Sequence, residues 1–180
     1  FVAAIAAVAL AGPAMAQDKL PASISATAYD TGSNGFNQIV AVGQMLKARV
    51  GVDLRVLPAG NDTARMAPLK SGRAQISANG IGTFFAQEGV LDFAAKDWGP
   101  QPARLILSSS SCNGQAMGVA KDTGVRTVAD IKGKRLGLVR GAPAINQSMY
   151  ALIAFAGYTP KDVTLVEFSS YGALWKGIMN

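Results

Sequence analysis

The sequence contains no histidine, a single cysteine and few aromatic residues (7%). Without histidine, the Cys–His and Ser–His pairs that activate a nucleophile are excluded, and no imidazole is available to a metal ion. Because Cys112 is alone, this sequence forms no intrachain disulfide, and its stability has to come from burial of apolar side chains. We therefore expect neither an enzyme nor a bound cofactor or metal.

Nucleotide-binding motifs are also missing. Gly32-Ser33-Asn34-Gly35 does not have the spacing G-x-G-x-x-G, and G-x-x-x-x-G-K-[ST] occurs nowhere. Gly80-Ile81-Gly82 begins like a dinucleotide fingerprint, but Phe85 stands where the third glycine is required. The acidic residues show no pairing that predicts a hydrolytic site. Both phosphate-loop interpretations therefore fail on spacing.

Charged residues are sparse as well, at 16% of the chain, with a formal net charge of +6. Nucleic-acid-binding proteins concentrate basic and aromatic residues on one surface. Here lysines and arginines are scattered among acidic residues, and the one cluster, Lys132–Arg135, is interrupted by Gly133. We expect no nucleic-acid partner. The basic excess is typical of a solvated surface, or it attracts an anionic ligand over distance.

The N-terminus holds an unbroken apolar run, Val2–Leu10, followed by Gly12-Pro13 and the small-x-small sequence Ala14-Met15-Ala16. This order predicts a signal peptide over residues 1–16, cleaved before Gln17. A membrane anchor or a buried helix is the alternative, but the run is too short to cross roughly 30 Å of hydrocarbon. We therefore expect an exported, periplasmic protein that is not inserted in the membrane after cleavage.

In the rest of the chain, apolar periodicity alternates between two residues and about 3.6 residues, which predicts an α/β fold with mainly parallel sheets flanked by helices. Strands are predicted at residues 22–29, 52–57, 74–78, 104–107, 115–120, 136–139 and 163–168. Helices are predicted at residues 36–46, 63–71 with Asp62 as N-cap, 128–132 after the cap Thr127, 144–156, and from 172 or 173 onward.

Three strand-to-helix turns, at residues 29–35, 58–63 and 79–83, combine glycine with hydroxyl or amide side chains. Glycine lets the backbone approach a ligand closely, and the free N–H groups of a helix N-terminus favour an anion. Each turn alone is an ordinary turn sequence. Because all three follow the carboxyl ends of predicted parallel strands, where such sheets place their crevice, together they predict a ligand site.

The polar run at residues 108–114 separates two apolar segments and is typical either of a connection between lobes or of a hairpin turn. On the first interpretation, residues 17–110 form most of lobe I and residues 111–180 begin lobe II. Residues 111–180 repeat the order of elements predicted for residues 17–110, with a strand, a turn and a helix in succession.

The segment Val128–Leu136, read V-A-D-I-K-G-K-R-L, resembles the phrase that opens the second lobe of type II periplasmic binding proteins. Thr31–Gly35, followed by Ala59–Asp62 and Leu69–Gly72, resembles the TAXI family, the solute receptors of tripartite ATP-independent periplasmic (TRAP) transporters. This resemblance, which runs through nearly all of residues 23–180, implies a two-lobed receptor that captures a small organic anion, a dicarboxylate or amino acid, and delivers it to a TRAP membrane permease.

Carried over by position, the resemblance implies ligand contacts from turns of both lobes. These are Tyr29, Thr31, Gly32, Ser33, Asn34, Gly60, Asn61, Asp62, Asn79, Gly80, Arg140, Gly141, Ala142, Ser169 and Tyr171. Arg140 is the one cation among them, and a guanidinium grips a carboxylate with two hydrogen bonds. Its alternative role is a surface charge at a strand end.

The chain departs from the family pattern at three places. Phe36 is followed by Asn37-Gln38 rather than by further aromatics, Arg73 replaces an acidic residue, and the sequence stops where the family continues, so we expect the fold to be incomplete at its C-terminus. Two other functions stay open. One is a receptor of the same fold that serves an ABC-type importer or a sensory system, and the other is a secreted enzyme on a similar two-lobed fold.

Overall fold

The computed structural model describes residues 20–108 and 116–179. The predicted signal peptide, the proposed lobe boundary near residue 110 and Cys112 lie outside these ranges, so they stay predictions. None of the described helices is both long enough and apolar enough to cross a membrane.

The first sheet has three parallel strands in the order β2-β1-β3: β1 (Ser23–Ala28), β2 (Asp53–Pro58) and β3 (Ile76–Ser77). Helices α1 (Asn34–Val50), α2 (Asp62–Lys70) and α3 (Gly82–Glu88) follow the strands in turn. Ala26 and Ala28 of β1 are fully buried against Ile39 of α1. Because these alanine side chains are small, α1 can pack closely on this sheet.

The second sheet pairs β4 (Arg135–Val139) in parallel with β5 (Thr164–Phe168). Helix α4 (Pro143–Phe155) connects the two strands, and α5 (Tyr171–Met179) follows β5. Parallel strands joined through helices confirm the predicted α/β class. The core here gathers Ile131, Leu136 and Ile153 on one side and Val139 and Leu174 on the other.

Short 3₁₀ helices connect the larger elements: η1 (Leu91–Ala94), η2 (Lys121–Thr123), η3 (Val128–Ile131) and η4 (Pro160–Asp162). Thr127 caps η3 through a capping box with Asp130, and Gly133 follows with φ 70°, both as predicted.

Two predicted strands are wrong, because residues 104–107 and 116–120 have no regular structure. Leu105, Ile106 and Leu107 are 75–82% exposed. A strand forms only where a neighbour pairs with its backbone, and nothing within the described residues pairs with this run. The predicted N-cap of α2 is also wrong: Asn61, not Asp62, accepts the capping hydrogen bond, from the N–H of Ala64 at 2.8 Å.

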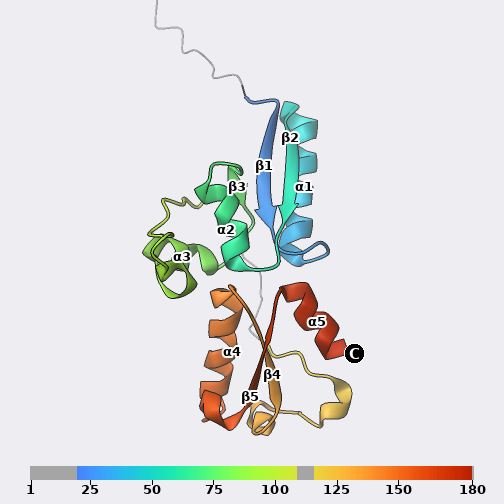
Figure 1. Cartoon of the computed structure of the whole chain (residues 1–180). Coiled ribbons are helices and arrows are strands. Elements are labelled where there is room, and N and C mark those ends of the chain that lie inside the picture. Colours follow the sequence, from blue (N-terminus) through green and yellow to red (C-terminus); the bar gives the residue numbers. More distant parts are fainter. Residues whose placement is uncertain (1–19, 109–115, 180) are drawn as a thin grey trace, which may run out of the picture.

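Figure 1 shows the two sheets stacked end to end, with the carboxyl ends of β1 and β2 directed toward the lower lobe. Helices α4 and α5 both begin at the upper end of that lower lobe, α4 beneath α3 and α5 beneath α1. The loops at the carboxyl ends of both sheets therefore face one another across a single junction.

Candidate functional site

The loops after β1, β2, β4 and β5 meet directly between the lobes. The N–H of Thr63 donates to the carbonyl of Gly141 at 3.0 Å, and the N–H of Tyr171 donates to the carbonyl of Gly60 at 2.9 Å. These hydrogen bonds join turns that lie far apart in the sequence. The structure thus brings the second turn predicted in lobe I against both turns predicted in lobe II, a region we call the inter-lobe junction.

Two glycines allow this close approach. A Cβ atom added to Gly60 would lie 2.5 Å from the Cβ of Ser170, so any side chain there would force the lobes apart. A Cβ on Gly141 would lie 2.7 Å from the Thr63 hydroxyl oxygen, and Gly141 also has φ +68°, which favours glycine. Both positions therefore require a residue without a side chain.

Asp62 lies at the centre of the junction and is fully buried. Its Oδ1 accepts hydrogen bonds from the Tyr29 hydroxyl at 2.7 Å and from Arg65 Nη2. Its Oδ2 accepts from the N–H of Ala144, at the start of α4, at 2.8 Å. As the first residue of α2 in lobe I, Asp62 is therefore bonded to a helix N-terminus of lobe II.

Arg65 is the cation of this junction, and sequence reasoning missed it. Its side chain is only 3% exposed, its Nη1 donates to the carbonyl of Ala78 at 2.8 Å, and its Cζ lies 3.6 Å from the ring centroid of Tyr29. The signal was present, because residues three apart on a helix are neighbours and the spacing of Asp62 and Arg65 predicts an ion pair. Among the described residues, Arg65 Nε is the one buried side-chain nitrogen or oxygen without a hydrogen-bond partner.

Tyr29 contacts both the Asp62–Arg65 ion pair and the aromatic rings of lobe II. Burial is the largest cause that raises the pKa of the Tyr29 hydroxyl well above its usual range; the nearby Arg65 opposes this effect and Asp62 adds to it. The Tyr29 ring lies 5.5 Å from that of Tyr171, and Tyr171 lies 6.1 Å from Trp175. Tyr29 thus remains a hydrogen-bond donor to Asp62 while its ring contacts the other lobe.

Asp30 makes a second carboxylate contact across the junction. Its Oδ2 accepts a hydrogen bond from the N–H of Gly172 at 2.8 Å, in the first turn of α5. Each of the two lobe II helices that begin at the junction is therefore bonded to an aspartate of lobe I.

Other predicted contact residues lie around this centre without joining it. Ser33 caps α1 by accepting from the N–H of Phe36, while Thr31, Gly32 and Asn34 are exposed. The Asn79 side chain contacts the sulfur of Met66 at 3.2 Å and accepts from the N–H of Gly80. Ala142 is buried beneath α4, and Ser169 is exposed.

The structure places Arg140, the predicted cation, away from the junction. Its side chain is 75% exposed and donates to Glu167 at 3.0 and 2.8 Å. The cause is the register of β4 and β5, which pairs Leu138 with Glu167 and so brings the end of one strand beside the other. These contacts fit the alternative role of Arg140, a surface charge at a strand end.

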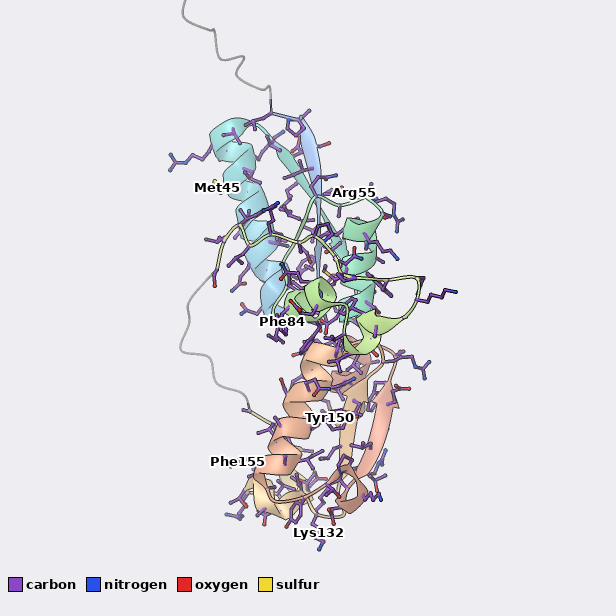
Figure 2. The ribbon with its side chains drawn as sticks, turned by 90° about the vertical axis from the view of Figure 1, so that its left-hand side faces the viewer. Met45, Arg55, Phe84, Lys132, Tyr150 and Phe155 are labelled. Carbon is purple, nitrogen blue, oxygen red and sulfur yellow. The ribbon has the colours of Figure 1, made fainter. Side chains whose placement is uncertain are left out.

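An apolar groove adjoins the junction. It has a volume of about 480 Å³, runs between α3 and α4, and begins beside Ala144, the residue that donates to Asp62. Its other lining residues are mostly apolar: Ile81, Phe85, Gln147, Ser148, Ala151, Leu152 and Phe155. Figure 2 shows α3 above the start of α4, with Phe155 near the far end of that helix. The groove thus places apolar surface next to a helix N-terminus.

No group of three or more Asp, Glu, Cys or His side chains suited to a metal ion occurs in the part of the chain that the structure describes. The hydrogen-bond donors of the inter-lobe junction are backbone N–H groups, the buried Arg65 guanidinium and the Tyr29 hydroxyl.

The model of the family described as NMT1/THI5 like matches residues 48–177 of this chain. Among curated proteins, none matches its sequence. Among the similar solved structures are two binding proteins. The first is the alkanesulfonate-binding protein SsuA from Xanthomonas axonopodis pv. citri bound to MOPS, with 19% identity and a TM-score of 0.50 over 84% of this chain and 49% of that one.

The second is the periplasmic aliphatic sulphonate binding protein SsuA from Escherichia coli, with 21% identity and a TM-score of 0.50 over 88% of this chain and 49% of that one. These likenesses confirm the predicted periplasmic binding protein fold. The chain spans about half the length of each of these relatives.

Proposed function

Because the chain belongs to the NMT1/THI5-like family, we propose that it is a periplasmic solute receptor that binds a small organic anion between its lobes and delivers it to a membrane transporter. The observation that carries the proposal is the junction itself, where the N-terminus of α4 adjoins an apolar groove that both lobes line. Such a site suits a ligand with one acidic group and one apolar part.

The acidic group would lie at the start of α4. Helix N-termini present unpaired N–H groups and partial positive charge, which favour an anion. Helix α4 has no acidic residue in its first turn, and its N-cap residue, Ala142, has no side chain able to cap it. The N–H of Ala144 is bonded instead to Asp62 of lobe I, which the ligand would have to displace. Arg65 adds a buried guanidinium with one unused N–H at the same junction.

The apolar part of the ligand would lie in the groove between α3 and α4. Ile81, Leu152 and Phe155 supply aliphatic and aromatic surface there. An alkanesulfonate, the ligand class named for both structural relatives, combines these two features. A dicarboxylate or an amino acid, as the sequence resemblance implies, would leave the apolar surface unused.

The transporter partner belongs to this proposal as well. An ABC-type importer is consistent with the family and with the structural relatives, whereas the comparisons give no support to a TRAP permease. Uptake reconstituted with each type of permease distinguishes them, because the first requires ATP and the second an ion gradient.

A chain-length series tests the ligand class. We expect the affinity measured by calorimetry to rise from methanesulfonate to hexanesulfonate by about fourfold for each methylene buried, since burying one CH₂ contributes about 0.8 kcal/mol. Succinate and glutamate should bind more weakly than hexanesulfonate. Tighter binding of succinate than of any sulfonate would contradict the proposed ligand class.

Two exposed alanines of α4 provide a matched pair for the groove. Ala151 lines the groove, whereas Ala154 does not. Ala151→Gln should abolish the dependence of affinity on chain length by filling the groove, and Ala154→Gln should preserve it. If both variants behave like the parent chain, the apolar part of the ligand lies elsewhere.

A further inference from the structure

Two aspartates of lobe I, Asp30 and Asp62, are bonded across the junction to lobe II. We propose that Asp30 and Asp62 form a latch that closes the lobes in the absence of ligand. We also propose that the acidic group of a ligand replaces the Asp62 carboxylate at the start of α4, a step that rests on the function proposed above.

The latch has two points of contact. Asp62 Oδ2 accepts from the N–H of Ala144, and Asp30 Oδ2 accepts from the N–H of Gly172, both at 2.8 Å. Hydrogen bonds to an ionised carboxylate are roughly twice as strong as neutral ones. Two such bonds at separate helices resist rotation of one lobe against the other.

Helix α4 depends on this contact because it has no cap of its own. Ala142 at its N-cap supplies no side-chain hydrogen bond, and its first turn contains no acidic residue. Asp62 therefore supplies from lobe I what Ser, Thr, Asp or Asn ordinarily supplies at an N-cap. Opening of the lobes would leave this helix N-terminus to water or to another anion.

Arg65 holds the Asp62 carboxylate on the lobe I side of the latch. Its guanidinium is 97% buried, since only 3% of the side chain is exposed, and it donates to Asp62 through Nη2. Its Nε has no hydrogen-bond partner among the described residues. The lobe I side of the junction therefore already holds one anionic group, the Asp62 carboxylate, through a buried guanidinium.

The groove continues from the same point. Ala144, the donor to Asp62, is also a lining residue of the hollow between α3 and α4. An anion in the place of the Asp62 carboxylate would have its apolar part directed along this groove. Latch and ligand thus compete for one N–H group.

The first measurement requires no ligand. Spin labels at Met45→Cys and Lys132→Cys, which Figure 2 places at opposite ends of the molecule, report the separation of the lobes in a Cys112→Ser background. Asp30→Asn should shift the distance distribution to longer values and broaden it. Asp53→Asn, which removes an exposed carboxylate that pairs with Lys47 in lobe I, should leave the distribution unchanged.

Asp62→Asn should produce the same shift as Asp30→Asn. Because Asp62 is buried and holds several partners, its variant is first checked for folding by circular dichroism; should it fail to fold, Asp30→Asn alone decides. An unchanged distance in the folded aspartate variants would overturn the latch.

Hexanesulfonate as probe then tests the competition. Asp30→Asn should bind it roughly five- to tenfold more tightly than the parent chain, within the range typical of coupled equilibria. Weaker binding by an opened aspartate variant would overturn the proposed replacement, because the aspartates would then belong to the ligand site. If the lobes open but neither chain binds any sulfonate, the latch stands and the proposed function fails.

Discussion

At the scale of single residues, Asp62 and Arg65 form an ion pair that water scarcely reaches, with side chains 0% and 3% exposed. Removing two charges from water is costly, and their mutual attraction offsets that cost only where further hydrogen bonds satisfy both groups. Tyr29 and Ala144 donate further hydrogen bonds to the Asp62 carboxylate, and the carbonyl of Ala78 accepts one from the Arg65 guanidinium. The pair therefore depends on contacts from both lobes.

Arg65→Met should destabilise the protein by about 3–5 kcal/mol, because it keeps most of the side-chain volume but leaves the Asp62 carboxylate buried without its cation. Denaturant unfolding followed by circular dichroism measures the loss. The control is Arg140→Met, which breaks an exposed ion pair with Glu167 and should cost about 0–1 kcal/mol. Equal losses in the two variants would contradict the assignment of Arg65 as the buried cation.

Arg65 also shows where sequence reasoning stops. The helix over residues 63–71 was predicted correctly in its main part, but Asp62 was predicted as its N-cap and Arg65 was given no role. What the sequence does not contain is the position of α4, which buries the pair from the opposite lobe. Arg140, by contrast, follows a predicted strand, but its side chain pairs with Glu167, which lies on another strand 27 residues away.

At the scale of elements, the five strands within the described residues all lie in predicted strand segments, because each segment is apolar or alternating and is bounded by turn residues. The two predicted strands that are absent, at residues 104–107 and 116–120, show the same local pattern. The difference lies in pairing: β1 has β2 and β3 beside it, whereas Leu105–Leu107 lies exposed. Periodicity identifies a segment able to form a strand, but tertiary neighbours decide whether it does.

The capping box of η3 leads to a pH prediction. Asp130 accepts from the N–H groups of Arg126 and Thr127 at 3.0 and 2.8 Å, and these backbone hydrogen bonds lower its pKa. A carboxyl group with a lowered folded-state pKa contributes stability above its unfolded pKa, about 3.9, and this contribution is lost as the pH falls through the folded value. Asp130→Asn should therefore lower the melting temperature at pH 6 and reduce the further loss between pH 4 and pH 2.

Asp122→Asn serves as the control, since Asp122 is an exposed aspartate of the neighbouring η2 helix. Its melting temperature should follow that of the parent chain at every pH. Thermal melts recorded at half-unit pH steps give all three curves. Parallel curves for Asp130→Asn and the parent chain would show that the capping carboxylate does not stabilise the fold.

At the scale of the whole molecule, the two lobes are joined by direct contacts of their loops rather than by a shared sheet. Gly60 accepts from the N–H of Tyr171 and approaches Ser170, while Gly141 accepts from the N–H of Thr63. The sequence predicted these turns from their glycines. It did not predict that they touch, because contact between loops of different lobes depends on how the sheets are oriented.

The close approach at Gly60 makes this residue a test of lobe closure. Gly60→Ala places a methyl group 2.5 Å from the Cβ of Ser170, so the lobes have to move apart, and the radius of gyration measured by small-angle scattering should rise. The matched control is Gly80→Ala, since a Cβ there meets nothing within 4 Å.

A chain held open by Gly60→Ala also cannot close on a ligand, so its affinity for hexanesulfonate should fall about tenfold, equivalent to about 1.4 kcal/mol. This direction is opposite to that expected for Asp30→Asn, which releases the closed state without blocking it. Unchanged scattering and affinity in Gly60→Ala would mean that the lobes do not meet at Gly60 and Ser170 in solution.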